Sequence, residues 1–343
     1  GNVVVIDSVV AGVGTSTLAA LLARELSERG LKCVLVDADL QGGGLDVLLG
    51  VENEDGSRFG EISAPLGNID GKALLRELPI WDGVPLLACD PWKTENPQSW
   101  EVQACIRALS QVRSAVIVDV GQGNGLQDLT ELRQAIRINV VEMTVLGLAR
   151  AKANMQSQRN PSDSIGEHDV ATREREFFIG MQPRGTIRDH GVTATEEAAE
   201  YLDCDIAAVI TTDAKLCSEL LEGLGLRKPN RANAKAIATL ADLIQEANLA
   251  LLASLKETAP QEKNDTWMRG RIRSGILHAI EEQTQQKFRD DYLVSKVENL
   301  EAAVKELTDD DDATKFTIDE LAVILDMNVD EIRDVLRLTG DDK

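Results

Sequence analysis

Residues Val3 to Leu18 read Val-Val-Val-Ile-Asp-Ser-Val-Val-Ala-Gly-Val-Gly-Thr-Ser-Thr-Leu. The β-branched run predicts a buried strand, the glycines predict a tight loop, and the residues after them begin a helical pattern. This is the layout of a phosphate-binding loop, which usually ends in Gly-Lys-Ser/Thr. Gly14 and Ser16 fit that ending, but Thr15 stands where the Lys is expected. We therefore expect a loop that holds a nucleotide and is poorly equipped to hydrolyse it.

The backbone of this loop can bind phosphate without the missing Lys. Glycines allow a close approach, and the surrounding amides form a concave anion site at the positive end of the following helix. The Ser16 hydroxyl is the expected Mg²⁺ ligand. The predicted nucleotide contacts are Gly12, Val13, Gly14, Thr15, Ser16 and Thr17. Taken alone, a strand-glycine-helix turn can also be purely structural.

Carboxylates follow two further apolar runs. Asp37 and Asp39 come after residues 33–36, and Asp119 comes after residues 115–118. Ligands of open α/β sheets bind at the carboxyl ends of the strands, where such groups can orient water or hold Mg²⁺ through water. We predict weak catalytic roles for Asp37 and Asp39 and a water-mediated Mg²⁺ contact for Asp119. Each of the three could by itself be an ordinary strand-end or turn-capping residue.

Strand and helix patterns alternate through residues 1–255. Continuous apolar strands between helices predict an α/β fold, a doubly wound and mostly parallel sheet with helices on both faces. The expected strands are 3–6, 33–36, 85–88, 115–118, 138–145, 177–181 and 206–210. The expected helices include 17–29, 101–111, 194–202, 215–223 and 232–255. Residues 157–175 are polar and predict a surface loop.

The remainder of the chain differs in kind. Residues 256–264 read as a polar linker, and residues 265–343 predict an all-α extension with a helix-turn-helix-like hairpin at 316–338. This hairpin is acidic, so protein contact is favoured over DNA contact. Residues 267–277 combine Trp267 and apolar residues with three arginines, which suits either packing on the first domain or peripheral contact with a membrane.

The composition of the chain argues against nucleic acid binding, disulfide bonds and membrane-spanning segments. Lys and Arg number 36 against 58 Asp and Glu, a net charge of −22 that disfavours direct nucleic acid binding. The five widely spaced cysteines predict buried thiols. No apolar run approaches the ~18 residues of a membrane span, so a cytoplasmic location is expected, with peripheral contact at the inner face of the plasma membrane left open. Because Gly1 stands almost directly before a strand, a preceding segment also remains open.

Three runs together carry a family resemblance. Ala11-Gly-Val-Gly-Thr-Ser-Thr, then Val36-Asp-Ala-Asp-Leu-Gln-Gly-Gly-Gly-Leu-Asp, then Val118-Asp-Val-Gly resemble the MinD/ParA superfamily of deviant-Walker ATPases over residues 1–255. The altered loop and the Gly-Gly-Gly-Leu-Asp run are similar to its CpaE/TadZ-like branch, which includes septum-site-determining (Ssd) proteins. The resemblance implies ATP or ADP with Mg²⁺, a homodimer, and a role in positioning a pilus, secretion or septum assembly.

The chain departs from the superfamily at two lysines. The signature Lys falls on Val10 and the phosphate Lys falls on Thr15, while Arg184 and Arg188 are substitutes by position alone. Since charge stabilisation is most of phosphoryl-transfer catalysis, hydrolysis is expected to suffer more than binding.

Two readings of function remain. One is a positioning scaffold that binds ATP weakly or without efficient hydrolysis and recruits partners through its C-terminal helices. The other is a slow ATPase of MinD/ParA type with nucleotide-driven dimerisation. A Rossmann dehydrogenase fits less well, because Thr17 occupies the position of its third glycine.

Overall fold

The computed structural model describes residues 2–40, 42–62, 69–90, 92, 97–122, 129–133, 135–157, 176–184 and 191–257, with side chains of the last helix described as far as residue 246. The predicted linker beyond residue 257, the region 265–343 with its hairpin, the segment 267–277 and nearly all of the predicted loop 157–175 lie outside these residues. The chain divides into two compact units, Gly1–Ile276 and Leu277–Lys343. The predicted domain limits at 255 and 265 stay predictions.

The described residues form one eight-stranded sheet with the order β3-β4-β2-β5-β1-β6-β7-β8. Every neighbouring pair is parallel except β3 and β4, which are antiparallel. The strands are β1 (Val3–Ser8), β2 (Cys33–Asp37), β3 (Ile80–Trp81), β4 (Val84–Leu87), β5 (Ala115–Asp119), β6 (Ile136–Glu142), β7 (Glu176–Met181) and β8 (Ile206–Ile210).

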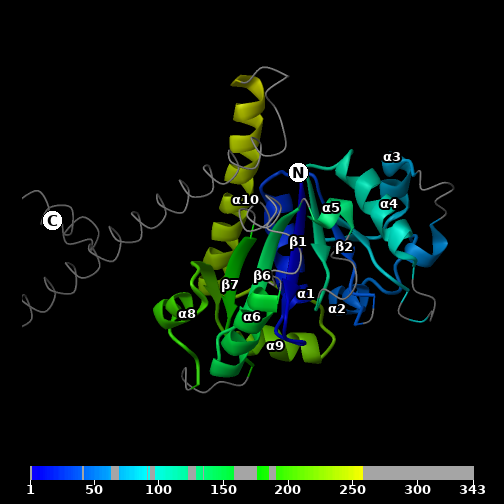
Figure 1. Ribbon diagram of the computed structural model, residues 1–343. Helices are drawn as coiled ribbons and strands as arrows, with labels where there is room; N and C mark the ends of the chain where they lie inside the picture. The colour runs from blue at the N-terminus through cyan, green and yellow to red at the C-terminus, as the bar shows by residue number, and fades with distance from the viewer. Residues whose placement is uncertain are drawn as a thin grey trace, which may run out of the picture. The chain divides into compact units, whose positions relative to one another are not determined.

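Helices cover both faces of the sheet (Figure 1). On one face lie α1 and α10, which contact each other, and on the other lie α4, α5, α6 and α8. The helices are α1 (Thr15–Glu28), α2 (Leu45–Leu49), α3 (Gly71–Glu77), α4 (Ser99–Ser110), α5 (Thr130–Arg133), α6 (Val145–Ser157), α8 (Thr195–Leu202), α9 (Ala214–Leu221) and α10 (Arg231–Glu257), with a short 3₁₀ helix at Phe59–Glu61. This arrangement confirms the predicted doubly wound α/β fold.

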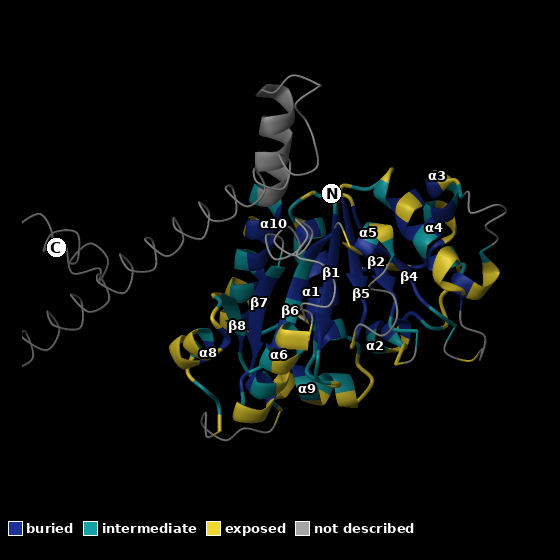
Figure 2. Cartoon of the chain, in the orientation of Figure 1, coloured by how far each residue is buried: buried dark blue, intermediate teal, exposed yellow. Residues whose placement is uncertain are grey.

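The core explains why these runs become strands. All six residues of β1 and all five of β2 and β5 are buried, and alternate side chains face opposite layers of helices. On the α4 side, Val3, Val5 and Val116 pack with Ile106 and Leu109. In Figure 2 the strands form a dark blue centre beneath a rim of exposed helix residues. Burial of apolar surface on both faces is what fixes this sheet.

One predicted strand boundary was wrong. Residues 138–145 were expected to form a strand, but β6 ends at Glu142 and Val145 already begins α6. The Thr144 hydroxyl accepts a hydrogen bond from the Gly147 amide at 3.0 Å, which caps the new helix. Apolar residues stand on both sides of Glu142 and Thr144, so hydrophobicity alone did not show where the strand stops.

The cysteines agree only in part with the prediction of buried thiols. All five are free; Cys33 and Cys105 are buried, whereas Cys89, Cys204 and Cys217 are partly exposed. Within the part of the chain that the structure describes, no helix has the length and apolar character needed to span a membrane.

Candidate functional site

The glycine loop connects the end of β1 to the start of α1. Gly12 and Gly14 have φ angles of 71° and 114°, which L side chains rarely adopt. Gly14 is the N-cap residue of α1, and as a glycine it supplies no side chain to the amides of the first turn. These amides and the helix dipole are therefore free to face an anion.

Thr15 faces inward. It is 7% exposed, and its hydroxyl donates to the Ser8 hydroxyl at 3.1 Å, which in turn donates to the Val10 carbonyl at 2.9 Å. The residue at the Lys position thus joins the two ends of the loop by a hydrogen bond and offers no charge to a bound phosphate. The sequence analysis did not assign a role to Ser8; the available signal was a hydroxyl residue at the end of the strand, directly before the glycine loop.

Asp37 and Asp119 lie side by side. They are partners in the parallel register of β2 and β5, and they are 2% and 1% exposed. The two carboxyl oxygens of Asp37 accept the amides of Leu45, at 3.0 Å, and Asp39, at 3.2 Å. Asp119 accepts the Gly121 amide at 3.0 Å. The structure therefore brings together two carboxylates that are 82 positions apart by sequence number (119 − 37).

Burial raises the pKa of both carboxyl groups. Burial is the largest cause for Asp37, and the neighbouring charge of Asp119 adds to it, so that its pKa rises to about 7. Burial also raises the pKa of Asp119, to about 6, although the nearby Ser16 hydroxyl favours its charged form. Two buried carboxylates of this kind favour a cation between or beside them.

Asp39 lies against the two neighbouring loops. Its carboxylate accepts the Gly42 amide at 2.9 Å. A Cβ added to Gly42 or Gly121 would come within 2.3 Å or 2.2 Å of Asp39 Oδ2, so the Asp39 side chain would have to move to admit it. Asp39 is partly exposed, unlike Asp37, and can therefore reach a water molecule at this edge.

The residues present fit a magnesium ion held mainly through water. The Oδ2 atom of Asp119 is buried and accepts no hydrogen bond of normal geometry from the described residues. Ser16, whose hydroxyl favours the charged form of this carboxylate, lies in the first turn of α1, directly after the glycine loop. The described residues hold no group of three His, Cys, Asp or Glu side chains able to bind a metal directly. Such a site would need phosphate oxygens and water to complete it.

Of the two candidate arginines, the structure describes only Arg184, and no hydrogen bond or ion pair among the described residues joins it to the loop. Arg184 is exposed shortly after β7, and Arg188 lies outside the described residues. The neighbour of the loop at the end of β7 is Met181 instead, because a Cβ on Gly14 would meet Met181 Cε at 3.5 Å.

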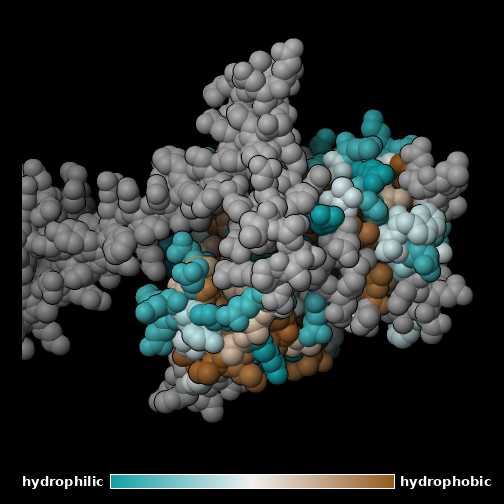
Figure 3. Space-filling model, in the orientation of Figure 1, coloured by the Kyte–Doolittle hydropathy of each residue, from teal (hydrophilic) through white to brown (hydrophobic). Residues whose placement is uncertain are grey.

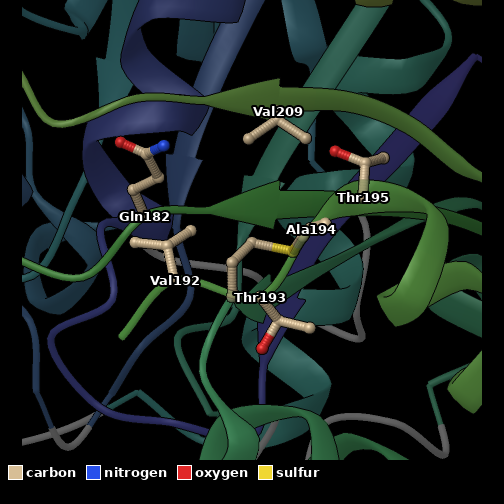
Figure 4. Close-up of a pocket in the computed structure, with 7 residues that line it drawn as sticks. Gln182, Val192, Thr193, Ala194, Thr195 and Val209 are labelled. Atoms are coloured by element: carbon tan, nitrogen blue, oxygen red, sulfur yellow. The ribbon is translucent and has the colours of Figure 1, made fainter. Parts of the chain in front are cut away.

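A second depression lies beyond β7 at the same edge of the sheet. It has a volume of about 300 Å³ and is lined by Met143, Gln182, Val192, Thr193, Ala194, Thr195 and Val209 (Figure 4). The Gln182 side chain is held by the Thr212 amide at 3.1 Å. No charged side chain is in this lining, so its chemistry suits an uncharged group and not a phosphate.

Apolar side chains are exposed near the carboxyl edge. Val145 and Leu146 at the start of α6 are 81% and 59% exposed, and Leu221 at the end of α9 is 84% exposed. In Figure 3, hydrophobic residues gather at the bottom of the view, where Figure 1 places α6 and α9. Exposed apolar surface of this kind is typical of an interaction site.

The comparisons with known proteins agree with this arrangement. A family profile described as ParA, NUBPL iron-transfer P-loop NTPase, matches residues 1–71. A septum site-determining protein MinD of Thermotoga maritima is 45% identical over 53 residues, which span 16% of this chain and 20% of that protein.

Solved structures share the fold over a longer range. A ParA family ATPase from Chlorobium tepidum superposes with a TM-score of 0.57 at 22% identity, covering 70% of this chain and 98% of its own. MinD in the MinC:MinD cell division protein complex of Aquifex aeolicus gives 0.54 at 19% identity, covering 76% and 98%. At these identities the likeness shows the fold alone. The chain therefore has the ParA/MinD-like fold of the P-loop NTPases.

Proposed function

We propose that this protein is a positioning scaffold of the CpaE/TadZ/Ssd type, which binds ATP or ADP with Mg²⁺ and hydrolyses ATP poorly. The observation that supports this most directly is the state of the loop. Its two positive-φ glycines and the start of α1 keep the shape that cradles a phosphate, while Thr15 is bonded internally to Ser8.

In this proposal, nucleotide binding depends on Mg²⁺. Asp37, Asp39 and Asp119 place negative charge beside the phosphate position, and neither Lys of the usual loop is present to offset it. Mg²⁺ near Ser16 and Asp119 would supply the missing positive charge and join the carboxylates to the phosphates. Nucleotide without Mg²⁺ is then expected to bind weakly.

Slow hydrolysis follows from the same residues. The transferring phosphoryl group develops charge that a P-loop Lys normally stabilises, and loss of such a stabilising group costs orders of magnitude in rate. Thr15 donates its only hydroxyl proton to Ser8, so it cannot stabilise that charge. Asp37 and Asp39 would still orient water, which leaves residual activity.

The positioning role and the partners rest on likeness to relatives. A MinD relative is named for septum-site determination, and another is seen in complex with MinC. We propose that this chain likewise forms a homodimer and recruits protein partners, through the apolar carboxyl edge around α6 and α9 and through the C-terminal region. A pilus, secretion or septum assembly is the proposed cargo.

The first test is a titration with a fluorescent ATP analogue, with Mg²⁺ and with EDTA. Binding in the micromolar range that requires Mg²⁺ supports the proposal. Asp119→Asn, which removes the charge and keeps the shape, should lose the dependence on Mg²⁺. No binding of the wild type at millimolar nucleotide would make the fold a scaffold without a nucleotide site and would overturn the proposal.

A slow ATPase of MinD/ParA type is the second candidate, favoured by the aligned carboxylates of β2 and β5. Thr15→Lys distinguishes the two. A large gain in hydrolysis shows that the other site residues are competent and that Thr15 alone limits the rate. Unchanged, measurable hydrolysis in both proteins would favour the slow ATPase as the native activity. Thr15→Met, of similar length without charge, is the matched control.

A further inference from the structure

The short helix α2 lies directly beside the candidate site. Its first amide, that of Leu45, donates to Asp37 Oδ2 at 3.0 Å. The helix has only five residues, and the glycines at its two ends, Gly44 and Gly50, have φ angles of 84° and 73°. No side chain caps its amino end. A helix of this length does not form by itself, so contacts from outside the helix must hold it in place.

One of these contacts is a buried ion pair. Asp46, which ends the Gly-Gly-Gly-Leu-Asp run, is 0% exposed, and its Oδ2 atom lies 3.5 Å from the Nε atom of Arg58. Arg58 is itself only 5% exposed. Its guanidinium also donates to the carbonyls of Val51 and Gly56, at 2.8 and 3.0 Å. A single buried cation thus connects α2 to the chain that follows it.

The segment that carries Arg58 is anchored to the edge of the sheet. The amide of Phe59 donates to the Ala88 carbonyl, just after β4, at 3.0 Å. The amide of Ser57 donates to the carbonyl of Glu77, the last residue of α3, at 2.6 Å. Both neighbours of Arg58 are therefore bonded to other elements of the domain. Arg58 is fixed by those elements, and α2 is in turn held by Arg58.

The energetics of a buried ion pair point to a role in geometry. Such a pair adds little net stability, because the desolvation of two charges offsets most of their attraction. Apolar packing already attaches α2 to the core, since Leu45 and Leu49 are 2% and 5% exposed. Apolar contacts are non-directional, whereas a bonded guanidinium specifies where the carboxylate lies. The ion pair therefore sets the orientation of the first turn of α2.

We infer that Arg58 is a positioning residue of the candidate site, which acts through Asp46 to hold the Leu45 amide against Asp37. Leu45 and Asp46 are adjacent in the chain, so a displacement of the Asp46 carboxylate also moves the Leu45 amide. Asp37 would then lose the donor to its Oδ2 atom, beside its register partner Asp119. For nucleotide binding, this inference rests on the function proposed above; for the contact itself, it does not.

Amide hydrogen exchange tests the contact without any ligand. The full chain, labelled with ¹⁵N-leucine, is measured by NMR in EDTA without nucleotide. Leu22, which is 0% exposed in α1, reports unfolding of the whole domain. In Arg58→Met the Leu45 amide should exchange about tenfold faster or more, relative to that of Leu22, than in the wild type. Arg58→Lys keeps the charge and should restore part of the protection.

A double variant separates positioning from stability. Asp46→Leu with Arg58→Met replaces the ion pair by apolar side chains, so the free energy of unfolding should return toward the wild-type value. The Leu45 amide should still exchange rapidly, because no charge directs the first turn of α2. Wild-type protection of Leu45 in this double variant would overturn the inference. Equal acceleration of Leu45 and Leu22 in Arg58→Met would do the same, because Arg58 would then act on stability alone.

Titration with the fluorescent ATP analogue and Mg²⁺ measures the effect on the site. Arg58→Met should bind about tenfold more weakly than the wild type, as expected when a residue that orients a metal site is lost. Arg24→Met is the matched control: Arg24 is also a buried arginine that donates to two carbonyls, and this variant should bind within about twofold of the wild type.

The two measurements fail separately. A wild type that binds no nucleotide contradicts the proposed function, and the exchange of Leu45 then decides the role of Arg58 by itself. Wild-type affinity in Arg58→Met, in a wild type that does bind, overturns the connection between Arg58 and the site. Equal weakening in Arg58→Met and Arg24→Met overturns it as well.

Discussion

A single hydroxyl shows how the loop keeps its shape without its Lys. Thr15 and Ser8 form a buried hydrogen bond at 3.1 Å, and Ser8 continues it to the loop carbonyl of Val10. In a P-loop with Lys at this position, the side chain contacts the phosphates of the bound nucleotide. In this chain the Thr15 side chain instead forms a hydrogen bond within the loop.

Replacing this hydroxyl should therefore cost stability. Thr15→Val keeps the shape but removes the donor, and we expect the free energy of unfolding to fall by about 1 kcal/mol. Urea denaturation measures the change. Thr15→Ser, which retains the hydroxyl, should lie much closer to the wild type, and equal losses for the two variants would contradict the role of the bond.

Asp37 makes the stability of the protein depend on pH. Its pKa of about 7 in the folded chain lies above the ordinary value of 3.8, so the folded state holds this proton more tightly than the unfolded state. The stabilisation is complete below the unfolded pKa and is lost as pH rises toward the folded pKa. Mg²⁺, which competes with the protons of this cluster, should in turn bind better as pH rises.

We expect the free energy of unfolding, measured in EDTA, to decrease between pH 5 and pH 8. Asp37→Asn should remove much of that decrease, by an amount on the order of 1 kcal/mol or more. Asp70→Asn at the N-cap of α3 should keep the wild-type pH dependence. A wild type that is equally stable at both pH values would contradict the raised pKa.

At the scale of elements, buried Arg24 ties α1 to the chain that leads into α10. Its guanidinium donates to the carbonyls of Leu226 and Arg227 at 3.1 and 3.0 Å, and it lies 5.3 Å from the centre of the Trp81 ring. Those two carbonyls belong to the segment between α9 and α10, which has no regular structure of its own.

Arg24→Met should destabilise the domain by about 2–4 kcal/mol, because it leaves hydrogen-bond acceptors without their partner. Arg107→Met is the control: Arg107 pairs with Glu131 and its side chain is 53% exposed, so a loss below about 1 kcal/mol is expected. Chemical denaturation compares the two variants, and a loss for Arg24→Met as small as that for Arg107→Met would contradict this role of Arg24.

The elements also show what the sequence could predict. Continuous apolar runs at 33–36 and 115–118 gave correct strands, because a strand buried on both faces needs no alternation. β3 was missed since it has only two residues, although Asp82-Gly83 before Val84 carries the positive φ angles, 45° and 80°, of a hairpin turn. The end of β6 was missed because its signal is the Thr144 cap, a polar residue inside an apolar run.

The sequence could predict which residues form the candidate site, but it could not predict the hydrogen bonds between them. Glycines and strand-end carboxylates stand at fixed places in the chain, so Asp37 and Asp119 could be assigned to one edge in advance. The direction of the Thr15 hydroxyl depends on the closure of the loop around Ser8, which no local pattern encodes. The burial that raises the pKa of Asp37 likewise arises only when β5 is in place.

At the scale of the whole molecule, the chain divides at residue 276 into two units. The sheet, the glycine loop and all three site carboxylates belong to the first unit. A chain ending at residue 276 should therefore unfold at the same urea midpoint as the full chain and bind the ATP analogue within about twofold of it. Loss of folding on truncation would show that residues 277–343 complete the core.

The central place of β1 in the sheet has a consequence for how the protein is made. Val3 pairs with Val116 on one side and Val4 pairs with Ile136 on the other. During synthesis, β1 is made before β5 and β6, so it stays unpaired until these two strands have emerged from the ribosome. Contacts so distant in sequence slow folding and leave sticky surface uncovered meanwhile. The order of the strands along the chain therefore sets how long β1 remains unpaired during folding.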